Sequence, residues 1–151
     1  MNYLHRFALC RYGFAALLIL VAANARATEK IELTAGIHRI EAELAYTNET
    51  RAQGLMHRTA MPPNHGMIFI FTEQARHCMW MRNTLMPLSV AFVDARGGII
   101  NIAEMQPHSE QNHCAEKPAR YALEMNSGWF KSRGIKPGAA ISGLQKAPQP
   151  R

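Results

Sequence analysis

Apolar and polar residues alternate over short stretches in much of this chain, which is the pattern of strands buried on one face. Lys30 to Leu33 and His38 to Ala45 alternate on either side of Thr34-Ala35-Gly36 and predict two strands joined by a turn. Met67 to Phe71 is apolar at every position. That run predicts a strand covered on both faces, at the centre of a sheet.

Further short apolar runs, separated by turn residues, predict a β-rich chain. Between them, residues 106 to 118 are mostly polar and predict the longest loop. The expected strands are Arg76 to Arg82, Leu88 to Asp94, Ile99 to Met105 (entered through the hairpin 95–98), Arg120 to Met125 and Ala140 to Leu144.

Two helices are expected among these strands. Thr47 can cap a helix from Asn48 to about Met56, in which Gly54 indicates a close approach of another backbone. Ser127 can cap a short helix from Gly128 to Arg133. The fold class is therefore α+β and β-rich, as a compact, curled, mostly antiparallel sheet or small open barrel with one main and one short helix. A single globular domain should span residues 28–145, followed by a flexible tail at 146–151.

The N-terminal segment has the pattern of a secretory signal. Arg6 and Arg11 precede a ten-residue apolar run, Phe14 to Ala23, and Ala25-Arg26-Ala27 then places small residues where a signal peptidase reads. A membrane span needs about 20 apolar residues. We therefore expect residues 1–27 to be removed and the protein to be periplasmic or secreted and free of the membrane; an uncleaved anchor is the alternative.

Charge and composition narrow the function classes. The 151 residues are 48% hydrophobic, with 17 basic and 11 acidic side chains and a net charge of +6. Loss of the three leader arginines lowers that charge to +3, since 14 − 11 = 3. No run of five or more basic residues remains, so nucleic acid is not expected as a partner. We expect a monomer without a cofactor.

The cysteines indicate one disulfide. Of three cysteines, Cys10 leaves with the leader, whereas Cys78 and Cys114 remain in an oxidising compartment. Closing this loop of about 37 residues removes unfolded-state entropy worth up to about 3.8 kcal/mol on the chain-entropy model.

Short motifs follow one another in fixed order at Arg51–Arg58, Gly66–Phe71, Trp80–Leu88, Ala91–Asp94, Pro118–Glu124 and Gly128–Phe130. Together they resemble the bacterial family named domain of unknown function 192. The resemblance spans nearly all of residues 29 to 144 and implies a secreted or lipoprotein-like, β-rich, compact protein without an established activity. Two positions depart from the family pattern, since Arg82 stands in place of lysine and Ser89 in place of the usual aspartate.

The strongest candidate for a ligand site follows the expected strand Arg76 to Arg82. Trp80 supplies a flat apolar platform, and Arg82, Asn83 and Thr84 add a cation and two short hydrogen-bonding side chains. This combination suits a small anionic or sugar-like ligand. The alternative is structural, with Trp80 in the core and Asn83 and Thr84 capping the turn.

Further arginines extend this candidate site. Arg51 and Arg58 flank the apolar residues of the first helix, and Arg120 lies on a later strand. Together with Arg82 they could converge on a carboxylate or phosphate. They could equally pair with Asp94, Glu124 or helix-terminal carbonyls in a structural role, and only a pocket would distinguish the two arrangements.

Copper binding is the second hypothesis. His77, Met79 and Met81 share one face of the expected strand, and His108 and His113 lie in the long loop, so soft donors could gather there. The methionines are equally suited to filling the core. We therefore predict no metal ligand.

Catalysis is the third hypothesis, with no catalytic residue assigned. His108, Ser109 and Glu110 are adjacent, so they cannot adopt the geometry of a triad. Cys114 beside His113 would suit a nucleophile, but export favours its oxidation. A non-enzymatic binding or accessory module is the first hypothesis. A buried carboxylate with a strongly shifted pKa in a cleft would favour an enzyme instead.

Overall fold

The computed structural model describes residues 28–151, so the expected signal peptide lies outside the described residues. Strands dominate this region, as the sequence pattern predicted. The elements are β1 (Lys30–Ala35), β2 (His38–Ala45), α1 (Asn48–Gln53), β3 (His65–Ala75), β4 (Cys78–Met79), β5 (Leu88–Val93), β6 (Ile99–Met105), β7 (His113–Cys114), β8 (Ala119–Asn126), α2 (Trp129–Ser132), β9 (Ile141–Ser142) and the 3-10 helix η1 (Leu144–Lys146).

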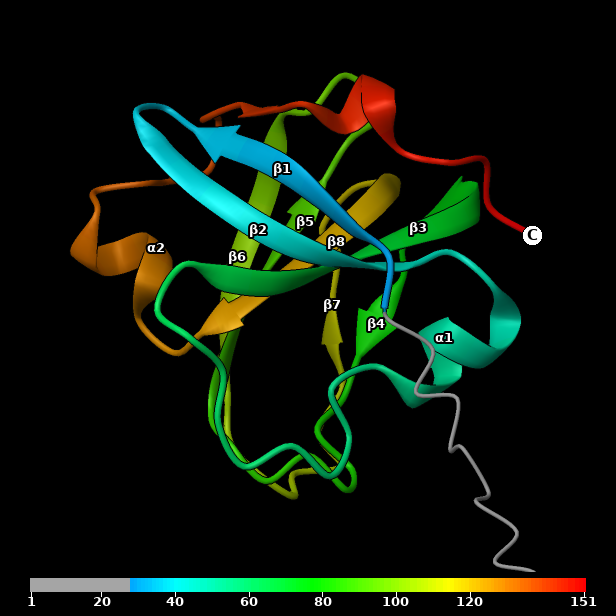
Figure 1. Cartoon of the computed structure of the whole chain (residues 1–151), viewed down its shortest axis with the longest axis vertical. Coiled ribbons are helices and arrows are strands. Elements are labelled where there is room, and N and C mark those ends of the chain that lie inside the picture. The colour runs from blue at the N-terminus through cyan, green and yellow to red at the C-terminus, as the bar shows by residue number, and fades with distance from the viewer. Residues whose placement is uncertain (1–27) are drawn as a thin grey trace, which may run out of the picture.

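Seven strands form one curled sheet in the order β6-β5-β8-β3-β2-β1-β9 (Figure 1). All neighbours are antiparallel except β2 and β3. A parallel pair needs a crossover, and the segment that contains α1 supplies it. The α+β, β-rich prediction is confirmed, and β3 occupies the predicted central position.

Both faces of this sheet are covered by apolar side chains. Along β3, Ile68 and Ile70 belong to one buried cluster, whereas Met67 and Phe69 belong to a second cluster on the opposite face. Trp129 and Phe130 of α2 pack into the first cluster, and Leu55, just after α1, packs into the second. The continuous apolar run of β3 therefore reflects burial on two sides.

The strand expected at Arg76 to Arg82 is largely wrong. Only Cys78 and Met79 form β4, which pairs with β7 in a separate two-stranded sheet. Beyond Met79 the chain turns, because the amide of Met81 donates to the carbonyl of Ser109 (2.9 Å) and that of Thr84 to the carbonyl of Met81 (3.0 Å). The last strand is likewise shorter than predicted.

The main helix ends at Gln53, before the predicted boundary. Gly54 follows it with a φ of 48°, and a Cβ at this position would lie 3.2 Å from Cζ of Phe69. The expected close approach of another backbone at Gly54 is therefore wrong, because the neighbour is the side chain of Phe69.

The start of α2 also differs from prediction. Gly128, with a φ of 75°, is the capping residue rather than Ser127. The hydroxyl of Ser127 instead donates to Oε2 of Glu104 (2.9 Å), a carboxylate on β6. A side chain bonded across the sheet is not available to cap its own helix.

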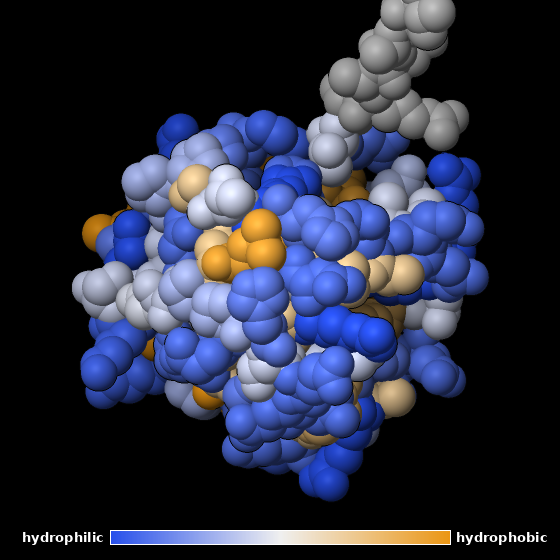
Figure 2. Space-filling view, turned by 90° about the horizontal axis from the view of Figure 1, so that it is seen from below, coloured by the Kyte–Doolittle hydropathy of each residue, from blue (hydrophilic) through white to orange (hydrophobic). Residues whose placement is uncertain are grey.

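The surface and the chain end complete the fold. The C-terminal tail runs back toward α1, and the Arg151 amide donates to the carbonyl of Tyr46 (2.8 Å). Seen from below, the surface is mainly hydrophilic, with a few scattered apolar residues between polar ones (Figure 2). Within residues 28–151, no helix has the length and apolar character needed to cross a membrane.

Candidate functional site

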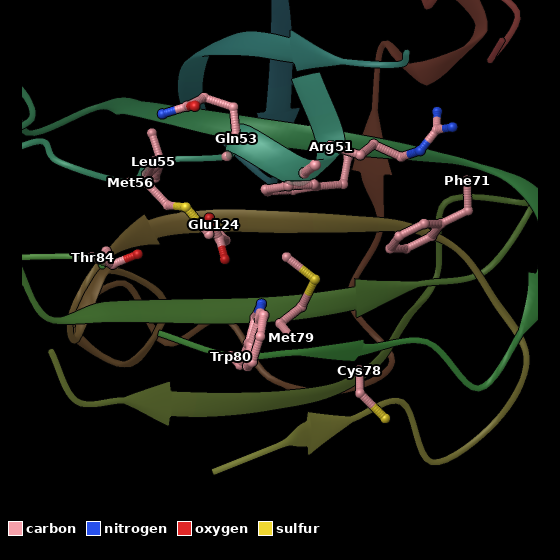
Figure 3. A pocket seen from close by; sticks show the side chains of 13 residues that line it. Arg51, Gln53, Leu55, Met56, Phe71, Cys78, Met79, Trp80, Thr84 and Glu124 are labelled. Carbon is pink, nitrogen blue, oxygen red and sulfur yellow. The ribbon is translucent and has the colours of Figure 1, made fainter. Parts of the chain in front are cut away.

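A small cavity lies between α1 with its following turn, the sheet, and the segment around β4 (Figure 3). Its volume is about 160 Å³, close to that of an engineered cavity of about 150 Å³ that holds benzene. A small molecule can therefore enter, but not a large cofactor. The lining residues are Arg51, Ala52, Gln53, Gly54, Leu55, Met56, Phe69, Phe71, Cys78, Met79, Trp80, Thr84 and Glu124.

Glu124 is the one acidic side chain of this lining. It lies on β8 directly between Met67 of β3 and Val90 of β5, and it is only 3% exposed. No described residue donates a hydrogen bond to its carboxyl group, and desolvation by burial raises its pKa to about 8. Since no fully enclosed polar side-chain atom of the described residues lacks a partner, the carboxyl oxygens must border the cavity.

Thr84 adds a second polar group to the cavity. Its side chain is 5% exposed, and its hydroxyl has no hydrogen-bond partner among the described residues. In Figure 3 that hydroxyl is turned toward the side where Glu124 lies. Trp80 lies at the opposite wall and is 44% exposed, which places it at the mouth. Among the lining residues, the cavity thus presents two buried polar groups without a partner, Glu124 and Thr84, and the more exposed Gln53 amide and Trp80 indole N–H also have none.

Arg51 lines the cavity, but its guanidinium is already bound elsewhere. Nη1 donates to the carbonyls of Tyr46 (2.7 Å) and Ile70 (3.1 Å), and Nη2 donates to Oδ1 of Asn48 (2.6 Å). Figure 3 shows the guanidinium pointing away from Glu124. Arg51 therefore fixes α1 to the end of β2 and to β3, and only the rest of the residue contributes to the wall.

Two of the other predicted arginines serve contacts away from the cavity. Arg58 forms a two-pronged ion pair with Glu43 on β2, with 2.6 Å between Nη2 and Oε2, and this pair lowers the pKa of Glu43. Nη1 of Arg120 donates an exposed hydrogen bond to the carbonyl of Thr72 (2.8 Å).

Arg82 and Asn83 likewise lie outside the lining. Arg82 lies with Cζ 5.6 Å from the Trp80 ring centroid and Nε 3.8 Å from Oε1 of Glu110. The carbonyl of Asn83 accepts the His57 amide (2.8 Å). Of the seven predicted site residues, the structure therefore brings only Arg51, Trp80 and Thr84 to the cavity.

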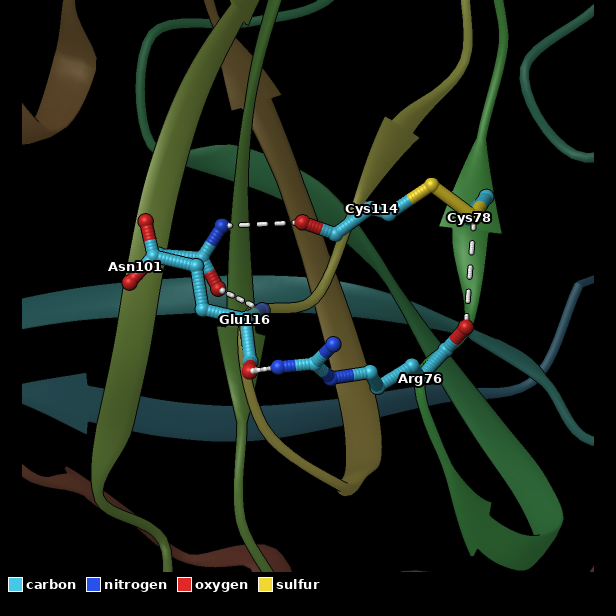
Figure 4. Close-up of a disulfide and its surroundings, with 5 residues drawn as sticks. All are labelled: Arg76, Cys78, Asn101, Cys114 and Glu116. Atoms are coloured by element: carbon cyan, nitrogen blue, oxygen red, sulfur yellow. Dashed lines mark hydrogen bonds between the residues drawn. A yellow bond between two sulfur atoms is a disulfide. The ribbon is translucent and has the colours of Figure 1, made fainter.

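The predicted disulfide between Cys78 and Cys114 is present (Figure 4). The two residues are direct partners in the β4–β7 pair, with Cα atoms 3.9 Å apart. The Asn101 side chain holds the same loop, because its Nδ2 donates to the carbonyl of Cys114 (3.1 Å) and its Oδ1 accepts the Glu116 amide (3.0 Å). Cys78 also lines the cavity, so the disulfide fixes one wall of the site.

The structure brings only some of the residues considered for copper together. The His77 ring stacks on Phe71 with 3.7 Å between centroids, and Met81 is fully buried in the core. Met79 and His113 are opposite each other in the β4–β7 pair. Within residues 28–151, no group of three or more His, Cys, Asp or Glu side chains could hold a metal ion.

Ser89, which departs from the family pattern, has a structural environment away from the cavity. Its hydroxyl donates to Oε1 of Glu104 (2.7 Å) and accepts the Gly128 amide (2.8 Å). Glu104 thus supplies an acid next to the position where the family usually has one.

Glu124 is a lining residue that no motif in the sequence indicates. Because Tyr121, Leu123 and Met125 alternate with it, the strand looked half-exposed, with Glu124 on the polar face. One residue in the sequence could have indicated that this face is buried. Ala122, a small apolar residue, shares the supposedly polar face with Glu124. Both faces of β8 are in fact covered, because Leu123 and Met125 pack into the first apolar cluster and Ala122 packs into the second.

Comparisons with known proteins agree with the resemblance in the sequence. A crystal structure from Sinorhizobium meliloti 1021, of a protein provisionally named a transcription regulator, is 38% identical with a TM-score of 0.72, over 78% of this chain and 95% of that chain. A crystal structure of a protein of unknown function from Novosphingobium aromaticivorans DSM 12444 is 34% identical with a TM-score of 0.75, over 79% and 89%. No curated protein matches the chain. The family model of DUF192, described as an uncharacterised ACR, matches residues 30–143, and the chain therefore belongs to the DUF192 family.

Proposed function

We propose that this protein is an exported, small-molecule binding or accessory module whose ligand occupies the cavity between α1 and β8. The observation that carries the proposal is Glu124, a buried carboxyl group without a partner that borders a cavity large enough for a small molecule. A ligand that bonds to this carboxyl group would supply hydrogen bonds that no described residue makes.

The lining favours one of the two ligand chemistries expected from the sequence. An anion would meet the Glu124 carboxyl group, while the guanidinium of Arg51 is already bound to backbone carbonyls. A hydroxylated or amine-bearing molecule would instead find a carboxyl group and the hydroxyl of Thr84 as partners. We therefore favour a ligand rich in hydrogen-bond donors over an anion.

Catalysis is the second candidate function, and the raised pKa of Glu124 is the observation that favours it. A carboxyl group that titrates at about 8 is suited to general acid or base chemistry near neutral pH. Besides Glu124, the ionisable lining residues are Arg51, which is bound elsewhere, and Cys78, which is oxidised. An enzyme would thus depend on Glu124 and Thr84 alone, and binding without turnover needs fewer groups.

Native mass spectrometry of the protein purified from the periplasm or medium tests this proposal. We expect the wild type to carry a non-covalent mass that is lost on denaturation, and the Glu124→Gln variant to carry less of it. Glu32→Gln is the matched control, since Glu32 is exposed on β1. A wild type that consistently carries no bound mass would contradict the proposal. A bound mass that is chemically converted over time would favour the enzyme.

A further inference from the structure

We infer that the ligand of this cavity is a small primary alkylamine, whose protonated amino group binds Glu124 and Thr84 while its carbon chain lies along the apolar walls. This inference rests on the proposed function and names its ligand class. It depends on three properties of the cavity, namely its uncompensated carboxyl group, its pattern of acceptors, and its size.

The carboxyl group lacks a positive partner within the protein. Arg51, the basic residue of the lining, directs its guanidinium to carbonyl oxygens, and it does not lower the pKa of Glu124. Arg58 lies on the same face of the sheet but pairs with Glu43 of β2. Glu43 and Glu124 are both register partners of Met67 on β3, so they lie two strands apart. The fold therefore leaves room for an external cation beside Glu124.

The acceptors match an ammonium group in particular. A protonated primary amine carries three N–H donors and no acceptor. The ionised Glu124 offers two acceptor oxygens, and the hydroxyl of Thr84 offers another. A quaternary ammonium group has the charge without the donors, and an alcohol has a donor without the charge.

The remaining walls suit a short hydrocarbon chain. Leu55, Met56, Phe69 and Met79 all line the cavity. The volume of about 160 Å³ limits the molecule to about the size of a benzene ring. Larger amines would have to extend through the mouth beside Trp80.

Binding of such a cation is coupled to a proton. Below pH 8 the empty site holds Glu124 mainly as the neutral acid, so an ammonium group must displace the proton. The charged groups on this face of the sheet are Arg58 and Glu43, whose pairing lowers the pKa of Glu43, whereas the guanidinium of Arg51 on α1 points away from Glu124. The affinity should therefore rise about tenfold per pH unit from pH 6 to pH 8 and level off above it.

Isothermal titration calorimetry of the mature protein with three probes tests the inference. The probes are n-butylammonium, 1-butanol of the same chain length, and tetramethylammonium. The amine stays protonated throughout, as a lysine side chain does. We expect n-butylammonium to bind at least about tenfold more tightly than either other probe at pH 8, and only its affinity to rise with pH.

Two lining variants and one control assign the effect to the site. Glu124→Gln should weaken n-butylammonium by about 30-fold or more and abolish the pH dependence. Thr84→Val, which keeps the shape of the side chain, should weaken it by about tenfold. Glu32→Gln should change nothing. Circular dichroism verifies that each variant is folded, and the pH profile of the wild type tests the inference without any variant.

Several results would overturn the inference. Equal binding of n-butylammonium and 1-butanol, or an affinity independent of pH, would show that charge is not recognised. Binding of tetramethylammonium as tightly as the amine would show that the N–H donors are not used. If the exported protein carries a bound molecule but n-butylammonium does not bind, the inference fails while the proposed function stands. If nothing is bound in either experiment, both fail.

Discussion

Glu124 makes the stability of the fold depend on pH in a direction opposite to that of the surface acids. Its ordinary pKa of 4.5 applies in the unfolded chain, whereas burial raises it to about 8 in the folded protein. Between these values the unfolded chain loses a proton that the folded state keeps. Stability should therefore fall as pH rises from 4.5 to 8, by up to about 1.4 kcal/mol per pH unit.

Urea unfolding of the wild type and Glu124→Gln at pH 5, 6, 7 and 8 measures this slope. The variant should show little decline over that range, because glutamine does not titrate. The pKa values of Glu41, Glu43 and Glu49 are lowered. Their contributions to stability are therefore lost only below about pH 4.5, outside the range in which Glu124 acts. Parallel declines in the two proteins would show that Glu124 does not titrate as proposed.

The arginines differ in what they contribute to stability. Arg58→Ala leaves Glu43, whose side chain is 12% exposed, without its partner, and we expect a loss of about 1–2 kcal/mol. This loss is smaller than that for a fully buried ion pair, because the side chain of Arg58 is 34% exposed and solvent screens its charge. Arg120→Ala removes one exposed hydrogen bond and should cost no more than about 0.5 kcal/mol.

Urea unfolding at neutral and acid pH distinguishes the two variants. The pKa of Glu43 is lowered by Arg58, so the stabilisation is present above the ordinary pKa of 4.5 and is lost as pH falls below it. The difference between the wild type and Arg58→Ala should thus shrink at pH 3. Equal losses in the two variants at pH 7 would contradict the assigned role of the ion pair.

At the scale of elements, local patterns predicted what depends on near neighbours. The alternation of β1 and β2, the apolar run of β3 and the Thr47 cap of α1 depend on the residues beside them, and all are found in the structure. The extent of β4 depends on which segment pairs with it, and β7 is only two residues long. No local pattern encodes that pairing.

The candidate site was only partly predictable for the same reason. Trp80 and Thr84 stand out in a short motif, but the burial of Glu124 depends on distant segments, α1 with its following turn and the region around β4, that cover this face of the sheet. The arginines stood out as cations, yet their partners are backbone carbonyls and Glu43, which sequence alone does not bring near them.

The β4–β7 pair depends on its disulfide. This sheet has only two residues in each strand, too few to be stable alone. Replacing Cys78 and Cys114 together by alanine should lower the stability by up to about 4 kcal/mol on the chain-entropy model. Because Cys78, Met79 and Trp80 line the cavity, the variant should also lose affinity for n-butylammonium.

Urea unfolding and calorimetry of the double alanine variant test this prediction. The wild type treated with a reducing agent is the matched comparison, since it opens the same bond without changing the sequence. Both should show faster hydrogen exchange in residues 76–84 and 106–118 than in β3. Unchanged affinity in both would show that the wall formed by β4 does not need the disulfide.

For the whole molecule, the remaining prediction is export with removal of residues 1–27. The expected new N-terminus, Thr28, is exposed, and β1 begins at Lys30, so cleavage leaves the core intact. Intact mass and N-terminal sequencing of the exported protein should give a chain that begins at Thr28, with no free thiol, because Cys10 is removed and the other two cysteines are paired. Protein made without export should retain Cys10 and show at least one reactive thiol. Recovery of the chain from the membrane fraction with Met1 in place would favour the uncleaved anchor instead, and the cavity would then act at the membrane surface.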